Sequence, residues 1–143
     1  MMRDAAESKG ITALVLGGRA IFSGAFLMAA AFKFAGMENT AAYIATAGFP
    51  FAGILAWVAA GFELALAFCF ASGAYFRQAS LLAAAYVIFL AFSFHGPSHW
   101  AANQDEFGFF VDHFTFMAGL FFATAHGPGR FAWRPGLLGP ARN

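Results

Sequence analysis

Five ionisable side chains lie inside apolar stretches of the chain, and their types allow ion pairing or proton exchange. A charge at the centre of a bilayer costs from about 2.5 to more than 10 kcal/mol, depending on the method. Such side chains therefore face the interior of a helix bundle, where they form structural pairs or serve a function. These five residues are Arg19, Lys33, Glu63, Asp112 and His113.

Glu63 is the only charge in its apolar stretch, and two interpretations of it stay open. In the structural interpretation, Arg19 or Lys33 neutralises Glu63 and fixes the helix register. Asp112 then takes the other cation, and the four residues form an intramembrane charged network. In the functional interpretation, Glu63 exchanges protons or forms a hydrogen bond with the head group of a quinone-like molecule.

Three histidines, His95, His99 and His113, fall near helix ends and are residue types that serve in proton relays or metal sites. The intervening Gly96-Pro97-Ser98 breaks the helix that a ligand pair at positions i and i+4 would need. We therefore favour an interfacial, water-wetted role for them. The single cysteine, Cys69, excludes a CxxC pair, and no haem or metal motif of adequate specificity is present.

The composition indicates that transmembrane helices position these residues. Of the 143 residues, 61% are hydrophobic and 10% are charged, whereas soluble proteins average about 25% charged. Four apolar stretches each approach the ~20 residues that a helix needs to cross about 30 Å of hydrocarbon. We predict an all-α integral membrane protein, a four-helix up-down bundle with short loops that forms a single membrane domain. The predicted spans are about 13–35, 51–71, 79–95 and 107–125, and an irregular tail covers 127–143.

The basic residues predict the orientation. Four spans put both termini on one side, and basic loops stay in the cytoplasm. Six basic residues then lie on the cytoplasmic side, and only Lys33 lies near the other face, so we predict cytoplasmic termini and the bacterial inner membrane. A net charge of +1 without basic runs argues against a nucleic-acid partner. The six residues are Arg3, Lys9, Arg77, Arg130, Arg134 and Arg142.

Short motifs follow one another along the chain in an order and spacing that together carry a resemblance. Most of them place a glycine, a proline or a charge at the end of an apolar stretch. In chain order they are Gly18 with Arg19, Lys33, Gly48 with Pro50, Glu63, Gly73 with Arg77, His95, and Gly127-Pro128-Gly129-Arg130.

Over about residues 16–130 this pattern resembles the DoxX-like family of small four-helix integral membrane proteins. Members often continue after the closing motif with Ser or Leu and an Asp, whereas Phe131-Ala132-Trp133-Arg134 follows here. The resemblance implies a membrane subunit or partner of an oxidoreductase system, which anchors it and contributes a quinone-side or proton-exchanging pocket. A more distant, DoxD-like relative is a subunit of a thiosulfate:quinone oxidoreductase.

Two other functions stay open. One is a purely structural or assembly subunit of a larger membrane complex, and the other is a small-molecule or proton transporter. In each case the expected partners are the lipid bilayer and other membrane or membrane-associated subunits. We do not expect catalysis by this chain alone, because no nucleophile-base pair or nucleotide motif is present.

Overall fold

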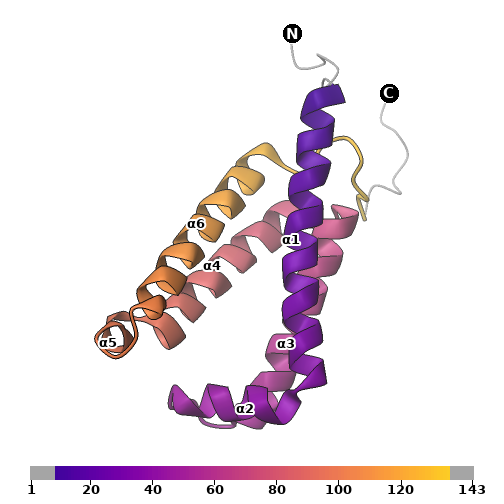
Figure 1. Cartoon of the computed structure of the whole chain (residues 1–143). Coiled ribbons are helices and arrows are strands. Elements are labelled where there is room, and N and C mark those ends of the chain that lie inside the picture. Colours follow the sequence, from indigo (N-terminus) through magenta and orange to yellow (C-terminus); the bar gives the residue numbers. More distant parts are fainter. Residues whose placement is uncertain (1–8, 136–143) are drawn as a thin grey trace.

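The computed structural model describes residues 9–135, so the predictions that concern Arg3, Arg142 and the tail beyond residue 135 lie outside the described residues. The described part is helical, with no strand (Figure 1). The helices are α1 (Lys9–Ala35), α2 (Met37–Thr46), α3 (Ala52–Ser72), α4 (Phe76–His95), α5 (Pro97–Trp100) and α6 (Asp105–His126).

Four of these helices, α1, α3, α4 and α6, are long and apolar enough to cross a membrane. The shortest of them, α4, has 20 residues, and at 1.5 Å per residue it spans about 30 Å. Large apolar side chains on their outer surfaces, such as Phe32 and Phe122, are more than two-thirds exposed. Outward-facing rings of this kind suit acyl chains, and the predicted all-α membrane fold is confirmed.

The long helices form two closely packed pairs. Helix α1 runs along α3, and α4 runs along α6, whereas α3 and α4 meet mainly near their short connection. Figure 1 shows the pairs diverging from this connection, with α2 lying across the far end of the first pair. We call the end of the molecule that carries the segment after α6 the tail end, and we call the opposite end the α2 end. Between α1 and α6 the backbones stay apart, and Phe22 and Phe26 reach across to Phe116.

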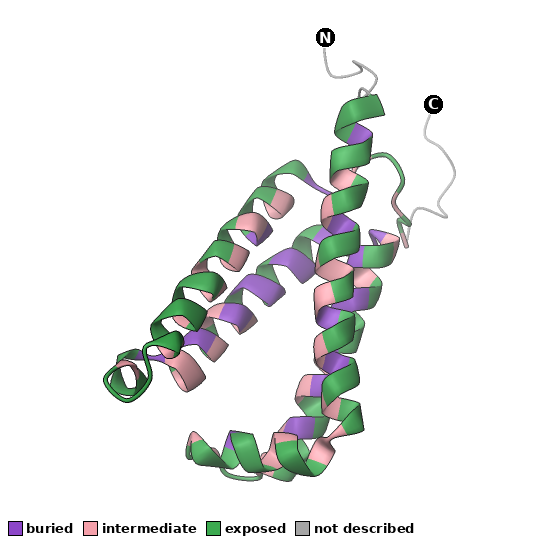
Figure 2. Ribbon diagram, in the orientation of Figure 1, coloured by how far each residue is buried: buried purple, intermediate pink, exposed green. Residues whose placement is uncertain are grey.

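Small residues let the paired helices approach each other closely. Ala56, Ala60 and Ala67 of α3 are all buried, and they form a stripe of small residues on the helix face that carries Glu63. Near the end of α3, the fully buried Phe70 stacks on Phe26, with ring centroids 5.7 Å apart and an interplanar angle of 3°. Figure 2 shows that the buried positions concentrate on α3 and α4, where the two pairs meet.

The short helix α2 was not predicted from the sequence. It follows α1 after Gly36 and ends before Gly48, whose positive φ of 80° favours glycine. With ten residues it is too short to cross a membrane, and its residues are on average less hydrophobic than those of the four long helices. By lying across the α2 end, it closes one side of the space between the two helix pairs.

Candidate functional site

Glu63 is held by residues from both helix pairs. Its side chain is only 2% exposed, and the Lys33 Nζ atom of α1 lies 2.8 Å from each of its carboxylate oxygens. The Tyr86 hydroxyl of α4 donates a hydrogen bond of 2.8 Å to Oε1. The ion pair therefore joins Glu63 to one of the two cations expected to neutralise it, and Tyr86 extends the link to the second helix pair.

The two carboxylate oxygens of Glu63 differ in their surroundings. Oε1 accepts hydrogen bonds from Lys33 and Tyr86, whereas Oε2 has the charge contact with Nζ but accepts no directed hydrogen bond within the described residues. The Lys33 side chain is 23% exposed, so the protein encloses the cation less completely than the acid. Glu63 consequently depends on Lys33 more than Lys33 depends on Glu63.

Arg19, the other cation considered for Glu63, has a different role. Its side chain is buried at the tail end, where Nε and Nη2 donate to the carbonyl oxygens of Phe70 and Ala71, at 3.0 and 2.6 Å. These carbonyls belong to the last turn of α3, which lacks intrahelical donors. Nη1 donates to the carbonyls of Pro128 and Phe131. Arg19 therefore caps α3 and holds the segment that follows α6.

The glycines of the motifs at the tail end allow this close packing. Gly73 ends α3 with φ of 78°, and a Cβ atom there would lie 2.7 Å from the Ala132 Cβ atom. At Gly127, with φ of 88°, a Cβ atom would lie 3.2 Å from an Arg77 guanidinium nitrogen. Gly129 also has a positive φ, and Arg130 lies over the Phe131 ring. Residues 127–135 form neither helix nor strand. Nothing in the packing explains Gly18, where an added Cβ would meet open space.

Asp112 does not take the second cation, and this prediction is wrong for the described residues. Its side chain is exposed, and within the part of the chain that the structure describes it forms no ion pair or hydrogen bond. The physical reason is that Arg19 is occupied at the tail end and Lys33 is occupied by Glu63. Asp112 instead borders a cavity beside Glu63 and His113.

Two of the three predicted histidines come together at the α2 end. The His95 and His113 ring centroids are 5.1 Å apart, and His95 Nδ1 lies 2.6 Å from a carboxylate oxygen of Glu106. His99 is exposed on α5 and contacts Ser98. Across residues 9–135, no group of three His, Cys, Asp or Glu side chains could hold a metal ion. The pair therefore suits hydrogen bonding or proton transfer.

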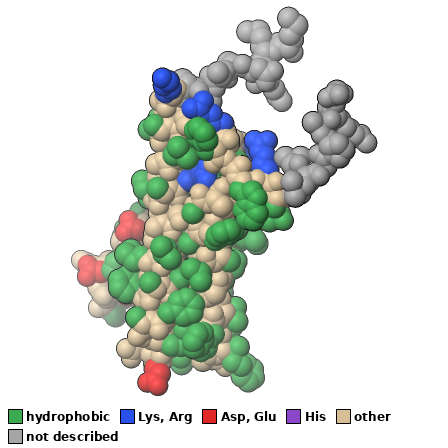
Figure 3. Space-filling view, turned by 90° about the vertical axis from the view of Figure 1, so that its right-hand side faces the viewer, with side chains coloured by type: hydrophobic (Ala, Val, Ile, Leu, Met, Phe, Trp, Pro, Cys, Tyr) green, Lys and Arg blue, Asp and Glu red, His purple; other side chains and the backbone are tan. Residues whose placement is uncertain are grey.

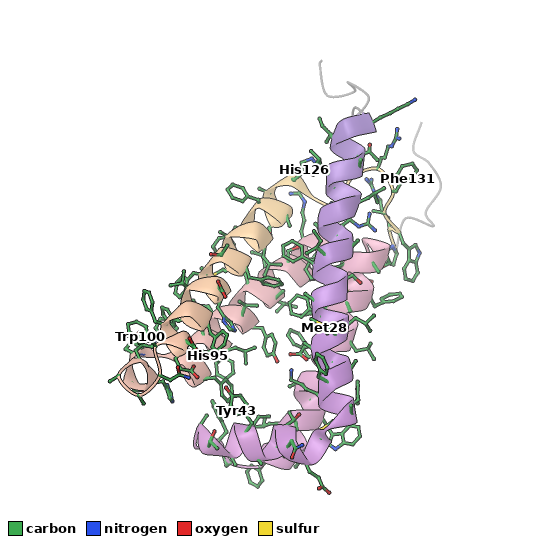
Figure 4. All side chains as sticks on the ribbon, viewed as in Figure 1. Met28, Tyr43, His95, Trp100, His126 and Phe131 are labelled. Carbon is green, nitrogen blue, oxygen red and sulfur yellow. The ribbon has the colours of Figure 1, made fainter. Side chains whose placement is uncertain are left out.

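A cavity of about 420 Å³, here called the head-group cavity, lies between α2 and the two helix pairs. Tyr43 of α2 stacks on Phe94 of α4, with centroids 4.9 Å apart. Burial raises the pKa of Tyr43, and the Glu106 carboxylate raises it further, so the phenol stays protonated at neutral pH. Tyr43 of α2 and His95 at the end of α4 both line this cavity, and Figure 4 labels them. The polar lining residues are Lys33, Thr40, Tyr43, Tyr86, His95 and His113.

Apolar side chains form the rest of the head-group cavity. Aromatic rings contributed by α3, α4 and the α2–α3 connection make up much of its wall. The cavity was not expected from the sequence, and neither was Tyr86, which donates a hydrogen bond to Glu63 from α4. The apolar lining residues are Ile44, Phe49, Leu55, Val58, Ala59, Phe62, Phe89, Leu90 and Phe94.

Charges are divided between the two ends of the molecule. On the face shown in Figure 3, Lys and Arg side chains gather toward the end that carries the N-terminus, and acidic side chains lie toward the other end. The predicted orientation rests on this asymmetry, and it puts the tail end in the cytoplasm. In that orientation, the head-group cavity and Lys33 lie toward the outer face, and Glu63 lies near the middle of α3.

Comparison with known proteins gives one match. The family model described as DoxX matches residues 14–96, which span α1 to α4 and include Arg19, Lys33, Glu63 and His95. A search of curated proteins and a search of solved structures found no significant match. The matched region covers more than half of the chain and contains the buried ion pair. The chain is therefore a member of the DoxX family and a multi-pass membrane protein.

Proposed function

We propose that this DoxX protein is a membrane subunit of an oxidoreductase system and that it binds a quinone-type head group in the head-group cavity. The observation that carries the proposal is an apolar, aromatic-walled cavity of about 420 Å³ bordered by Lys33, Tyr43 and two histidines. Sites for small organic ligands have this character, with volumes of about 300–1,000 Å³ and a few polar groups that fix orientation.

The polar groups match the chemistry of a quinone ring. An oxidised quinone has two carbonyl acceptors on opposite edges, and the reduced form has two hydroxyl donors. The Lys33 ammonium and the Tyr43 hydroxyl serve as donors to the carbonyls. His113 donates through Nδ1 to the Phe109 carbonyl at 2.6 Å, which leaves Nε2 as an acceptor for a reduced ring.

The walls suit a planar ring with an apolar tail. Phe62, Phe89 and Phe94 line the cavity and offer faces and edges for aromatic contact. Reduction of the ring consumes two electrons and two protons. In this proposal a partner dehydrogenase supplies the electrons, and this chain supplies the binding site and the acid Glu63 beside it.

A cavity-filling substitution tests the proposal without replacing either residue of the ion pair. Ala59 lines the cavity, whereas Ala65 is exposed on the same helix and lines neither this cavity nor the others described here. We expect Ala59→Phe to weaken the binding of a short-chain ubiquinone analogue at least tenfold, and Ala65→Phe to leave it unchanged. Calorimetric titration of protein in lipid nanodiscs measures both.

Two results would overturn the proposal: the absence of binding to the wild-type protein, or equal binding by Ala59→Phe and Ala65→Phe.

Purification from native membranes tests whether the protein is a subunit of an oxidoreductase system. We expect a dehydrogenase and an extractable quinone to accompany the protein. A partner complex without quinone, together with failed binding, would favour the structural or assembly role instead.

A further inference from the structure

A second cavity, of about 260 Å³, lies beside the Lys33–Glu63 pair on the side where α1 and α6 diverge. It shares Tyr86, Leu90 and His113 with the head-group cavity, but it is bordered by Glu63, whereas the first cavity is bordered by Lys33. The ion pair thus stands between the two cavities, with the cation on one side and the acid on the other. The lining residues are Ala25, Phe26, Ala29, Glu63, Tyr86, Val87, Leu90, Asp112, His113 and Phe116.

Glu63, which borders the second cavity, has one carboxylate oxygen, Oε2, whose only contact in the described residues is the charge contact with Lys33 Nζ at 2.8 Å. Glu63 is 2% exposed, and its Oε2 atom accepts no directed hydrogen bond within the described residues. An ionised oxygen in such a place is costly unless a donor reaches it. A water molecule occupies about 30 Å³ in the liquid, so a cavity of this volume with Glu63, Asp112 and His113 in its lining has room for several. Water is the donor that fits both the size and the open shape of the space.

Polar groups continue from Glu63 toward the α2 end. Asp112 is exposed and lies seven residues after the start of α6 at Asp105, which is about 10 Å along the helix axis. His113 borders the cavity and has Nε2 as its remaining acceptor. The titratable groups that face Glu63 and this cavity are Lys33 from α1, Tyr86 from α4, and Asp112 and His113 from α6.

We propose that the second cavity is a water-filled proton inlet that connects Glu63 with the aqueous phase at the α2 end, past Asp112 and His113. A hydronium ion gives one proton to Glu63 Oε2 and becomes water, and the carboxylic acid later releases that proton. The use of this proton by a quinone rests on the proposed function, whereas the hydration of the inlet does not.

Cysteine accessibility in a Cys69→Ser background tests the inlet. Ala29 lines the cavity, and its neighbour Met28 lies at nearly the same depth, is 57% exposed and lines neither cavity. In lipid nanodiscs we expect the thiol of Ala29→Cys to react with a charged methanethiosulfonate reagent at least tenfold faster than that of Met28→Cys. Equal, slow rates at both positions would show that the cavity is dry and would overturn the proposal.

The charge of the inlet gives a second, independent measurement. With Ala29→Cys present, we expect a cationic reagent to react faster than an anionic one, and Asp112→Asn to reduce that ratio severalfold. Asp105→Asn, at an exposed acid outside the cavity, is the matched control and should leave the ratio unchanged. A ratio that does not respond to Asp112→Asn would contradict a proton path past this carboxylate.

These results are separable from those of the quinone experiment. Fast labelling of Ala29→Cys in a protein that binds no quinone would preserve the inlet and reject the proposed function. Slow labelling in a protein that binds quinone normally would reject the inlet alone.

Discussion

Glu63 is more deeply buried than Lys33. We therefore expect loss of Lys33 to lower the stability more than loss of Glu63. Lys33→Met leaves a carboxylate that is 2% exposed with Tyr86 as its only hydrogen-bond donor among the described residues. Loss of one partner from a buried pair costs about 3–5 kcal/mol because the remaining charge is uncompensated. Glu63→Gln leaves an ammonium group on a side chain that is 23% exposed, and the amide oxygen still accepts from Tyr86. We expect a smaller loss, on the order of 1–2 kcal/mol.

The double variant Lys33→Met with Glu63→Gln removes both charges, and we expect it to be more stable than Lys33→Met alone, because no unpaired buried charge remains. The free energy of unfolding is measured in mixed detergent and dodecyl sulfate micelles by tryptophan fluorescence. Lys9→Met, at an exposed lysine at the other end of α1, is the control and should match the wild type. A Glu63→Gln loss equal to or larger than the Lys33→Met loss would refute the reasoning.

Three further predictions concern the tail end and the orientation. Gly73→Ala should lower the thermal stability, because the left-handed backbone alone costs about 1–2 kcal/mol and the added Cβ meets the tail, whereas Gly53→Ala, in open space within α3, should not. Arg19→Lys should speed proteolysis of the segment after α6, since a lysine cannot hold carbonyls of α3 and the tail together; unchanged cleavage would exclude this role. A reporter fused after Asn143 should be cytoplasmic and one inserted near Asn103 external, and the reverse result would invert the orientation.

The membrane class and the four spans could be predicted because apolar length is a local property of the sequence. The helix ends were less predictable. Helix α1 already includes residues 9–12, ahead of the predicted start near residue 13, and α6 begins at Asp105 rather than at 107, because polar and charged residues continue a helix beyond its apolar part. Helix α2 was missed, since ten residues carry little periodic signal.

The charged site could be predicted only in part. A buried acid in a membrane span calls for a cation, and this argument correctly links Glu63 with α1. The choice between Lys33 and Arg19 was open because both are offset from Glu63 along the axis, and the carbonyls at the end of α3 that occupy Arg19 are not visible in a pattern of side chains. Tyr86 could have been found as the one tyrosine of an apolar span, since its hydroxyl needs a partner when buried.

The two cavities could not be predicted at all. They arise because the α1–α3 and α4–α6 pairs diverge from the connection between α3 and α4, and that angle depends on how whole surfaces pack. Helical periodicity gives the face of each residue but not the angle between two pairs of helices. Thus the sequence shows that most residues of the head-group cavity are apolar, but it could not predict that they come together around Lys33.

The most direct test of the central claim is photolabelling with an azido-quinone, followed by identification of the labelled peptides in protein held in lipid nanodiscs. We predict that the label attaches to residues of the head-group cavity, such as Tyr43, Phe62 and Phe89, that excess unlabelled quinone displaces it, and that Ala59→Phe abolishes it. Label spread over lipid-facing residues such as Phe122, unaffected by competitor or by Ala59→Phe, would contradict a quinone site in this cavity.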